Sequence, residues 1–284
     1  IVTLTYRPVR QFSAFVGGSL ELNDASIFGT EQKGALEQYV QANPRRAGLF
    51  RVPEGTTLAV AERIGFLDEG TLVTSSIEHV RATPVGGEEA GEGVFDATTS
   101  QFLRLTQRVA GYIRLSDKGL ALAGSVRWGM NQQLIDRSRT YPDRLFFLGG
   151  VDSVRGFTQD SMIPEDIAQQ LLDPESGLQL NQVVIRGGDA FVNPRLELRV
   201  PLSGNVQTGL FLDSGNLWRD PEKVNPLSLR YAVGSGLRIT TPIGPLGFDY
   251  GFNVDRVLDE LYPQRTRQRY WEPMGAFHFS IGLF

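Results

Sequence analysis

The chain has 284 residues, 41% of them hydrophobic, and a formal net charge of −4, so it is long enough for one large β domain or two ordinary domains. The charge gives no reason to expect a nucleic-acid partner, and the absence of cysteine excludes a disulfide framework and cysteine-ligated metal sites. No apolar run approaches the roughly 18 residues of a membrane-spanning helix, although a barrel strand needs an apolar residue only at every second position.

Alternation of apolar and polar residues recurs along the chain, most clearly after Lys118. It predicts about twelve strands, at 1–8, 13–23, 33–43, 57–67, 71–82, 99–115, 118–130, 189–201, 205–218, 227–240, 244–254 and 274–284. The segment 42–55 contains Pro44 and Pro53 and is either a loop or a broken strand. A short helix is expected at 164–172. No signal peptide precedes the first strand, so we expect a mature chain or part of a longer one.

Alternation alone does not separate a soluble sandwich from a membrane barrel. Two features favour the barrel. The predicted strands have about 10 to 14 residues, which suits a tilted membrane crossing. Short turns at 67–70, 116–119, 202–205 and 241–245 also alternate with long loops at 82–98, 131–190, 219–226 and 255–273. We therefore predict an all-β fold, a transmembrane antiparallel barrel formed as a single domain by residues 1–284.

The longest predicted loop contains Val154, Arg155, Gly156 and Phe157 in succession. By themselves these four residues could form a polar surface turn. On the two strands that follow the loop, the carboxylates and one aromatic residue occupy the positions that alternate with the apolar face: Glu197, Phe211 and Asp213. A guanidinium in a restricted interior needs carboxylates to offset its desolvation.

The run 149–157, the strand segments 196–201 and 209–215, the hairpin 231–250 and the terminal Phe284 resemble the BamA/TamA superfamily of outer-membrane assembly and translocation barrels. The resemblance is strongest over 118–284. It implies that the VRGF tip of the long loop folds back into the lumen. There Arg155 would pair with Glu197 and Asp213 as a structural latch, while Gly156 allows a close approach to the wall. Phe157 would pack on Phe211 or on a neighbouring glycine.

The C-terminal strand carries Phe277, Phe279 and Ile281 and ends on Phe284. These residues resemble the terminal targeting signal of outer-membrane barrels, in which an aromatic residue ends the last strand. They could equally form a lipid-facing aromatic belt, and the two roles are compatible. Near the other end, residues 22–29 resemble an early periplasmic turn.

A search for enzyme chemistry is unproductive. The only histidines, His79 and His278, lie on predicted strands without recognisable partners, and no helix follows Gly234-Ser235-Gly236 to make a dinucleotide loop. We expect no catalytic residue, no metal and no cofactor. Several arginines fall on the polar face and would either line a water-filled lumen or pair with neighbouring carboxylates: Arg127, Arg195, Arg199, Arg230 and Arg238.

The resemblance implies a factor that inserts or translocates unfolded outer-membrane or secreted polypeptides across a lipid bilayer. A weak seam between the first and last strands would let the strand at 274–284 template a client strand. The family usually has about sixteen strands, preceded by periplasmic POTRA domains and assisted by accessory lipoproteins, whereas no POTRA domain is recognised here. The alternatives are a two-partner secretion transporter for a dedicated substrate, or a passive porin or anchor barrel. The expected location is the bacterial outer membrane, or alternatively the outer membrane of a chloroplast or mitochondrion.

Overall fold

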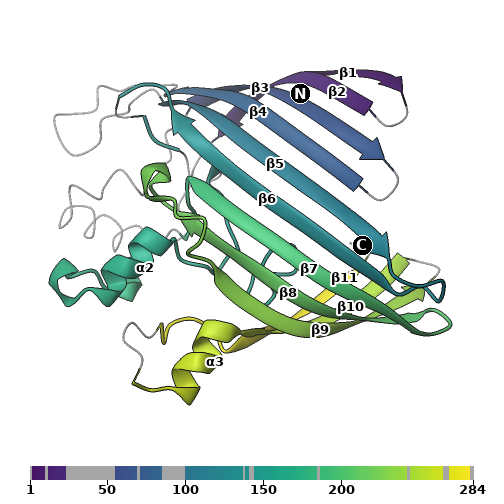
Figure 1. The fold of residues 1–284 in the computed structure, drawn as a ribbon. Helices are drawn as coiled ribbons and strands as arrows, with labels where there is room; N and C mark the ends of the chain where they lie inside the picture. Colours follow the sequence, from purple (N-terminus) through teal and green to yellow (C-terminus); the bar gives the residue numbers. More distant parts are fainter. Residues whose placement is uncertain are drawn as a thin grey trace.

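A computed structural model describes residues 2–9, 12–23, 55–68, 71–84, 100–136, 138–140, 144–183, 186–241, 244–264 and 269–281. In this part of the chain, eleven strands form one sheet in which every strand pairs antiparallel with its neighbours in sequence (Figure 1). The strands are β1 (Val2–Val9), β2 (Phe12–Asn23), β3 (Gly55–Asp68), β4 (Thr71–Pro84), β5 (Ser100–Arg114), β6 (Ala121–Gln133), β7 (Ala190–Ser203), β8 (Val206–Trp218), β9 (Arg230–Thr241), β10 (Gly244–Asn253) and β11 (Gly275–Ile281).

The sheet curves from β1 round to β11, and its connections differ in length at the two ends (Figure 1). The end that carries the helices has the long connections, with α2 (Glu165–Leu172) between β6 and β7 and α3 (Val254–Leu261) between β10 and β11. The described parts of these connections also contain three short 3-10 helices: η3 (Pro174–Ser176), η4 (Leu180–Gln182) and η5 (Pro221–Lys223). The β5–β6 and β7–β8 turns at the opposite end are short. The predicted alternation of short turns and long loops is therefore confirmed for these connections.

Eleven of the predicted strands are confirmed, with ends displaced by at most a few residues. The predicted strand at 33–43, most of the turn at 22–29 and Phe284 lie outside the described residues. The predicted helix at 164–172 is confirmed as α2. A long connection lies between β10 and β11, as predicted at 255–273, and it begins with a helix that was not predicted, α3 (Val254–Leu261). The apolar residues Val254, Val257, Leu258 and Leu261 recur at helical spacing, and the Asn253 side chain caps the first turn.

The two faces of the sheet differ in polarity as the alternation predicts. On β8, Leu210 and Leu212 face outward with 53% and 42% exposure, whereas Phe211 and Asp213 face inward and are buried. The outward face continues across β9, β10 and β11 with exposed aromatic and aliphatic residues, including Tyr231, Val233, Phe248, Tyr250, Phe252, Phe277 and Phe279. A soluble sandwich would bury this apolar face, so the observed polarity is that of a barrel wall in lipid.

Among the described residues, no helix combines the length and the apolar character needed to cross a bilayer.

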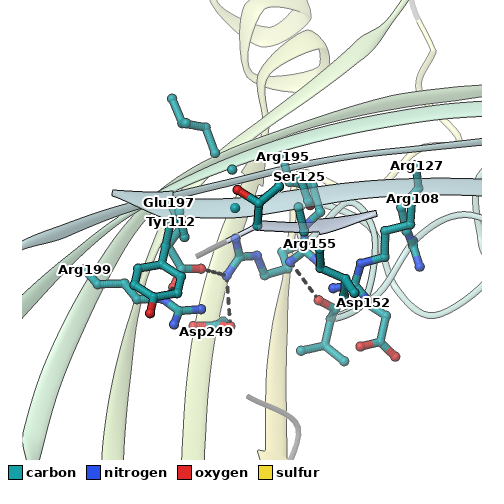
Figure 2. A pocket seen from close by; sticks show the side chains of 18 of the residues that line it. Arg108, Tyr112, Ser125, Arg127, Asp152, Arg155, Arg195, Glu197, Arg199 and Asp249 are labelled. Carbon is teal, nitrogen blue, oxygen red and sulfur yellow. Dashed lines mark hydrogen bonds and ion pairs between the residues drawn. The ribbon is translucent and has the colours of Figure 1, made fainter. Parts of the chain in front are cut away.

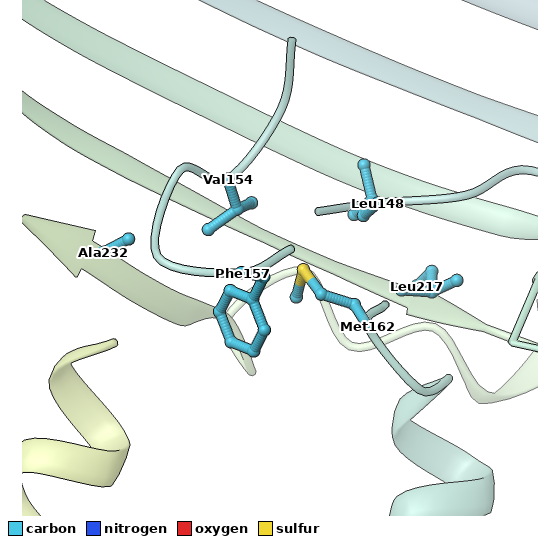
Figure 3. Close-up of a cluster of buried hydrophobic side chains, with 6 residues drawn as sticks. All are labelled: Leu148, Val154, Phe157, Met162, Leu217 and Ala232. Atoms are coloured by element: carbon cyan, nitrogen blue, oxygen red, sulfur yellow. The ribbon is translucent and has the colours of Figure 1, made fainter. Parts of the chain in front are cut away.

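A small apolar cluster lies on the inner side of the sheet, near the end that carries the helices (Figure 3). Four of its members come from the β6–β7 connection, and the other two come from β8 and β9: Leu148, Val154, Phe157, Met162, Leu217 and Ala232. All six are almost completely buried. This cluster packs the long connection against the inner wall and so positions the segment between its members, which contains Arg155.

Candidate functional site

Arg155 lies at the tip of the β6–β7 connection and is 1% exposed. Its Nε and Nη2 donate to the two oxygens of the Asp213 carboxylate on β8, at 2.7 and 2.9 Å. Its Nη1 donates to Glu197 on β7 at 2.8 Å and to Asp249 on β10 at 3.3 Å. The guanidinium is thus held by carboxylates from three strands, with the fork geometry that suits a bidentate arginine pair.

Two further contacts hold the loop tip on the wall. The Phe211 ring lies under the guanidinium, with the Arg155 Cζ 3.4 Å from the ring centroid. The main-chain N–H of Arg155 donates to Asp213 at 3.2 Å. Because Phe211 pairs directly with Glu197 in the β7–β8 register, the aromatic ring and the carboxylate lie beside each other on the inner face. Asp213 faces the same side two residues further along β8.

Other arginines surround the same carboxylates. Arg195 bonds Asp213 at 3.2 Å, and Arg199 bonds Glu197 at 3.1 Å. Arg238 on β9 reaches Glu197 at 3.1 Å and Asp249 at 3.3 Å. The cluster therefore contains four arginines and three carboxylates. The ion pairs between them offset the cost of removing the buried groups from water.

Sequence reasoning placed Glu197 and Asp213 opposite the loop tip but missed Asp249 and Arg238 as members of the cluster. The signal was present, because both residues occupy inward positions of the alternation on β10 and β9. The sequence did not reveal that the loop tip would also contact β10, beyond the two strands that follow the loop. That contact depends on the order and register of strands β7 to β10.

Glycines allow the loop backbone to lie directly against the wall. A Cβ on Gly156 would approach the Ala232 Cβ to 2.7 Å, and a Cβ on Gly251 would collide with the Arg155 carbonyl. That carbonyl lies 3.0 Å from Nε2 of His278 on β11. The loop tip therefore contacts strands from β7 to β11, including the last described strand.

Phe157 is completely buried on the inner side of the sheet. It belongs, with Val154, to the apolar cluster of Figure 3, and it packs with Met162 and Ala232 among others. Phe211 instead supports the Arg155 guanidinium. The two apolar residues of the tip anchor the loop, and the arginine between them reaches the carboxylates.

On β11, Phe277, Phe279 and Ile281 face outward and are more than half exposed. Phe248 of β10 lies beside them, with ring centroids 5.1 Å from Phe279 and 6.4 Å from Phe277. The three residues therefore belong to an aromatic and aliphatic belt on the outer face. Phe284, the fourth residue of the expected terminal signal, lies outside the described residues.

A second charge cluster holds α2 to the mouth of the barrel. Glu165 accepts two hydrogen bonds from Arg269, at 2.7 and 2.9 Å, and lies 3.3 Å from Arg230 Nη2. The Asn216 side chain donates to the same carboxylate at 3.0 Å. Burial alone would raise the pKa of Glu165, but the Arg269 and Arg230 guanidiniums outweigh it and lower the pKa to about 2. The sequence contained no local signal for this pairing, since Glu165 and Arg269 are 104 residues apart.

Most of the polar-face arginines pair with neighbouring carboxylates. Arg195, Arg199, Arg230 and Arg238 pair with carboxylates, whereas Arg127 donates to the Asn193 side chain at 3.0 Å. Several of them also line a cavity of about 780 Å³ beside the loop tip. Within the described ranges, no group of three or more histidine, aspartate or glutamate side chains is arranged to hold a metal ion.

A curved antiparallel sheet with an apolar outer face and a loop latched onto its polar inner face defines the class of outer-membrane β-barrels. Comparison with known families agrees: residues 82–284 match the Omp85 superfamily domain. The chain belongs to the Omp85 superfamily.

Individual relatives agree with this assignment. The chain is 32% identical over 144 residues to the outer membrane protein assembly factor BamA of Nitratidesulfovibrio vulgaris, and 25% identical over 150 residues to the chloroplastic outer envelope protein 80 of Arabidopsis thaliana. These matches cover 49% and 50% of this chain but only 15% of each relative. The crystal structure of BamA from Haemophilus ducreyi lacking POTRA domains 1–3 superposes with a TM-score of 0.62 at 17% identity, covering 98% of this chain and 52% of that one.

These findings establish the fold and the location. The fold is that of the BamA barrel, and the location is an outer membrane, either of a bacterium or of an organelle such as the chloroplast. The matched part of the chain covers only 15% of the length of each curated relative. The matches therefore do not define the activity of the whole protein.

Proposed function

We propose that this chain is the barrel part of a factor that inserts polypeptides into an outer membrane or translocates them across it. Family membership supports insertion or translocation in general terms. Unfolded outer-membrane or secreted polypeptides would be the clients. Periplasmic POTRA domains and accessory lipoproteins would be the partners of the full-length protein. The work would need no cofactor, because client folding and the burial of apolar surface in lipid supply the driving force.

The observation that carries the proposal is the latch at the loop tip. Arg155 is tied to Glu197, Asp213 and Asp249, and its carbonyl contacts His278 of β11. A passive pore has no need for such an arrangement, because strand pairing alone holds its wall together. A barrel whose seam opens must keep its remaining strands in place while the pairing at the edge is lost.

The mechanism follows from the cost of an open edge. Within the described part of the chain, β11 pairs with β10 alone and β1 pairs with β2 alone. Unpaired main-chain groups in lipid cost several kcal/mol each. An edge at β11 would therefore bind an incoming client strand by β-augmentation. Meanwhile the latch would brace β7, β8 and β10 behind that edge, and His278 would connect the brace to β11 itself.

The test uses the full-length protein in proteoliposomes and follows the folding rate of an unfolded outer-membrane client. Arg155→Glu places a fourth carboxylate among three and should abolish the acceleration seen with wild type. Lys118→Glu makes the same change of charge in the exposed β5–β6 turn and should leave the acceleration intact.

Three outcomes would contradict the proposal. If the wild-type protein does not accelerate client folding but conducts ions steadily, the chain is a passive pore. If it exports one dedicated polypeptide and ignores other clients, the chain is a two-partner secretion transporter, and a general role with many outer-membrane or secreted clients is wrong. If Arg155→Glu accelerates folding as well as wild type does, the latch has no part in the activity.

A further inference from the structure

The cavity beside the loop tip is lined by residues of the β6–β7 connection and of strands β4 to β7, β9 and β10, and Figure 2 shows many of their side chains. Six arginines line it: Arg108, Arg127, Arg155, Arg195, Arg199 and Arg238. Three carboxylates also line it: Asp152, Glu197 and Asp249. Asp213 lies behind the wall of the cavity and pairs with two of the arginines. Among the described residues at this cavity, six guanidiniums against four carboxylates leave an excess of two positive charges.

This excess is concentrated on one side of the cavity. The four arginines nearest the loop tip are in ion pairs with Glu197, Asp213 or Asp249. Arg108 and Arg127 make no ion pair with any described residue, although the exposed Asp152 lines the same cavity. Arg127 donates through Nη2 to Asn193 at 3.0 Å, but its Nε is buried without a hydrogen-bond partner.

The strand register brings two positive charges together on this side of the cavity, which destabilises the fold when no anion is bound there. Arg108 on β5 pairs directly with Arg127 on β6, and Figure 2 shows the two side chains next to each other. Like charges directly opposite each other on antiparallel strands destabilise the pair. A buried N–H without an acceptor adds a desolvation cost. An anion bound between the two guanidiniums would remove both costs.

A phosphate group fits this site better than a single carboxylate does. Guanidiniums bind phosphate through paired N–H donors in a planar fork. A phosphate monoester carries about −1.5 to −2 charges at pH 7, which matches the excess of two. Arg195 lies on the adjacent strand β7 and lines the same cavity. Its Nε and Nη2 donate to Asp213 and to the Val151 carbonyl, so it would assist through its remaining nitrogen and its charge.

We infer that Arg108 and Arg127, assisted by Arg195, form a binding site for a phosphate group inside the barrel. The group is either free phosphate or the phosphomonoester of a lipid headgroup. The site shares Arg195 with the charge cluster at the loop tip, because Arg195 also bonds Asp213. It does not depend on the proposed insertion activity.

Isothermal titration calorimetry of inorganic phosphate into the full-length protein in detergent, in phosphate-free buffer, tests the inference. Arg108→Gln and Arg127→Gln should each weaken binding by about tenfold or more. Arg108 makes no bond to another described side chain, so its replacement leaves the fold intact. Lys118→Gln removes the same charge from the exposed β5–β6 turn and should bind phosphate as wild type does.

Equal phosphate binding in all four proteins, or none in wild type, overturns the inference. A second titration with dihexanoyl phosphatidic acid distinguishes the sources. Displacement of phosphate by this lipid, lost in Arg127→Gln, identifies a headgroup ligand, whereas phosphate binding without displacement identifies free phosphate. Binding of an acidic peptide in the absence of any phosphate binding would instead identify a polypeptide site and would also overturn the inference.

Discussion

At the scale of single residues, the chemistry of arginine explains the loop tip. Arg155 donates to both oxygens of Asp213 and also reaches Glu197, while its planar face rests on Phe211. A lysine ammonium could satisfy one carboxylate but could neither form the bidentate pair nor stack on the ring in the same way. The buried carboxylates in turn require this cation, because a buried charge without a partner is far more costly than a paired one.

Replacing Arg155 by glutamine should therefore lower the free energy of unfolding by about 3–5 kcal/mol, since it leaves buried carboxylates short of a cation. Urea unfolding in detergent measures the change. Arg199→Gln is the matched control, because Arg199 shares the partner Glu197 but its side chain is 43% exposed. The control should cost at most about 1 kcal/mol. If the two variants lose equal free energy of unfolding, burial of the arginine–carboxylate pair has no effect on its contribution to stability.

At the scale of elements, α2 is held in place by its first two residues. Glu165 binds Arg269 and Arg230, and Asp166 accepts hydrogen bonds from the main-chain N–H groups of Arg219 and Asp220, each at 3.0 Å. These bonds connect the β6–β7 connection to the β8–β9 and β10–β11 connections. These three long connections therefore form one interlocked layer at this end of the barrel.

The contribution of Glu165 should depend on pH. Its pKa in the folded protein is about 2, below the ordinary value of 4.5, so its ionised form stabilises the fold fully above about pH 4.5. This stabilisation is lost as the pH falls toward 2. The difference in unfolding free energy between wild type and Glu165→Gln should be constant above pH 4.5 and should shrink below it.

The matched control for this measurement is Glu175→Gln, in the exposed η3 turn of the same connection. The unfolding free energy of this variant should be close to that of wild type at every pH. If the difference in unfolding free energy between wild type and Glu165→Gln stays unchanged down to pH 2, the carboxylate does not bind the two arginines in its ionised form.

At the scale of the whole molecule, polarity is inverted relative to a soluble β protein. The inner face holds buried charges such as Arg155, Asp213 and Asp249, whereas leucine and aromatic side chains cover the outside. Lipid makes this arrangement stable, because the outward side chains lose contact with water only when the sheet is inserted.

A charge on the outer face should therefore oppose insertion. Leu212→Arg, in the outward row of β8, should destabilise the barrel in lipid vesicles by up to about 4 kcal/mol, the cost of an arginine at the bilayer midplane. Leu227→Arg is the control, because Leu227 is 88% exposed in the β8–β9 connection outside the wall. Its effect should stay within about 0.5 kcal/mol. If the two variants fold equally well in vesicles, the outer face of β8 does not contact lipid.

Much of this architecture could be predicted from the sequence because it depends on local alternation. Side chains on a strand point to opposite faces in turn, so Leu210 and Leu212 identify the outer face, and Phe211 and Asp213 then fall on the inner one. Helix α3 carried a local signal too, in the spacing of Val254, Val257 and Leu258, but the strong strand pattern around it concealed that signal.

By itself, the sequence determined which residues face inward and that Arg155 would need carboxylates such as Glu197 and Asp213. Only the tertiary structure decided that Asp249 joins them, that Phe211 supports the guanidinium, and that Glu165 meets Arg269 across 104 residues. The physical reason is that alternation specifies a face but leaves the register between strands open in steps of two residues. Contacts between distant strands and loops follow from that register and from the curvature of the sheet.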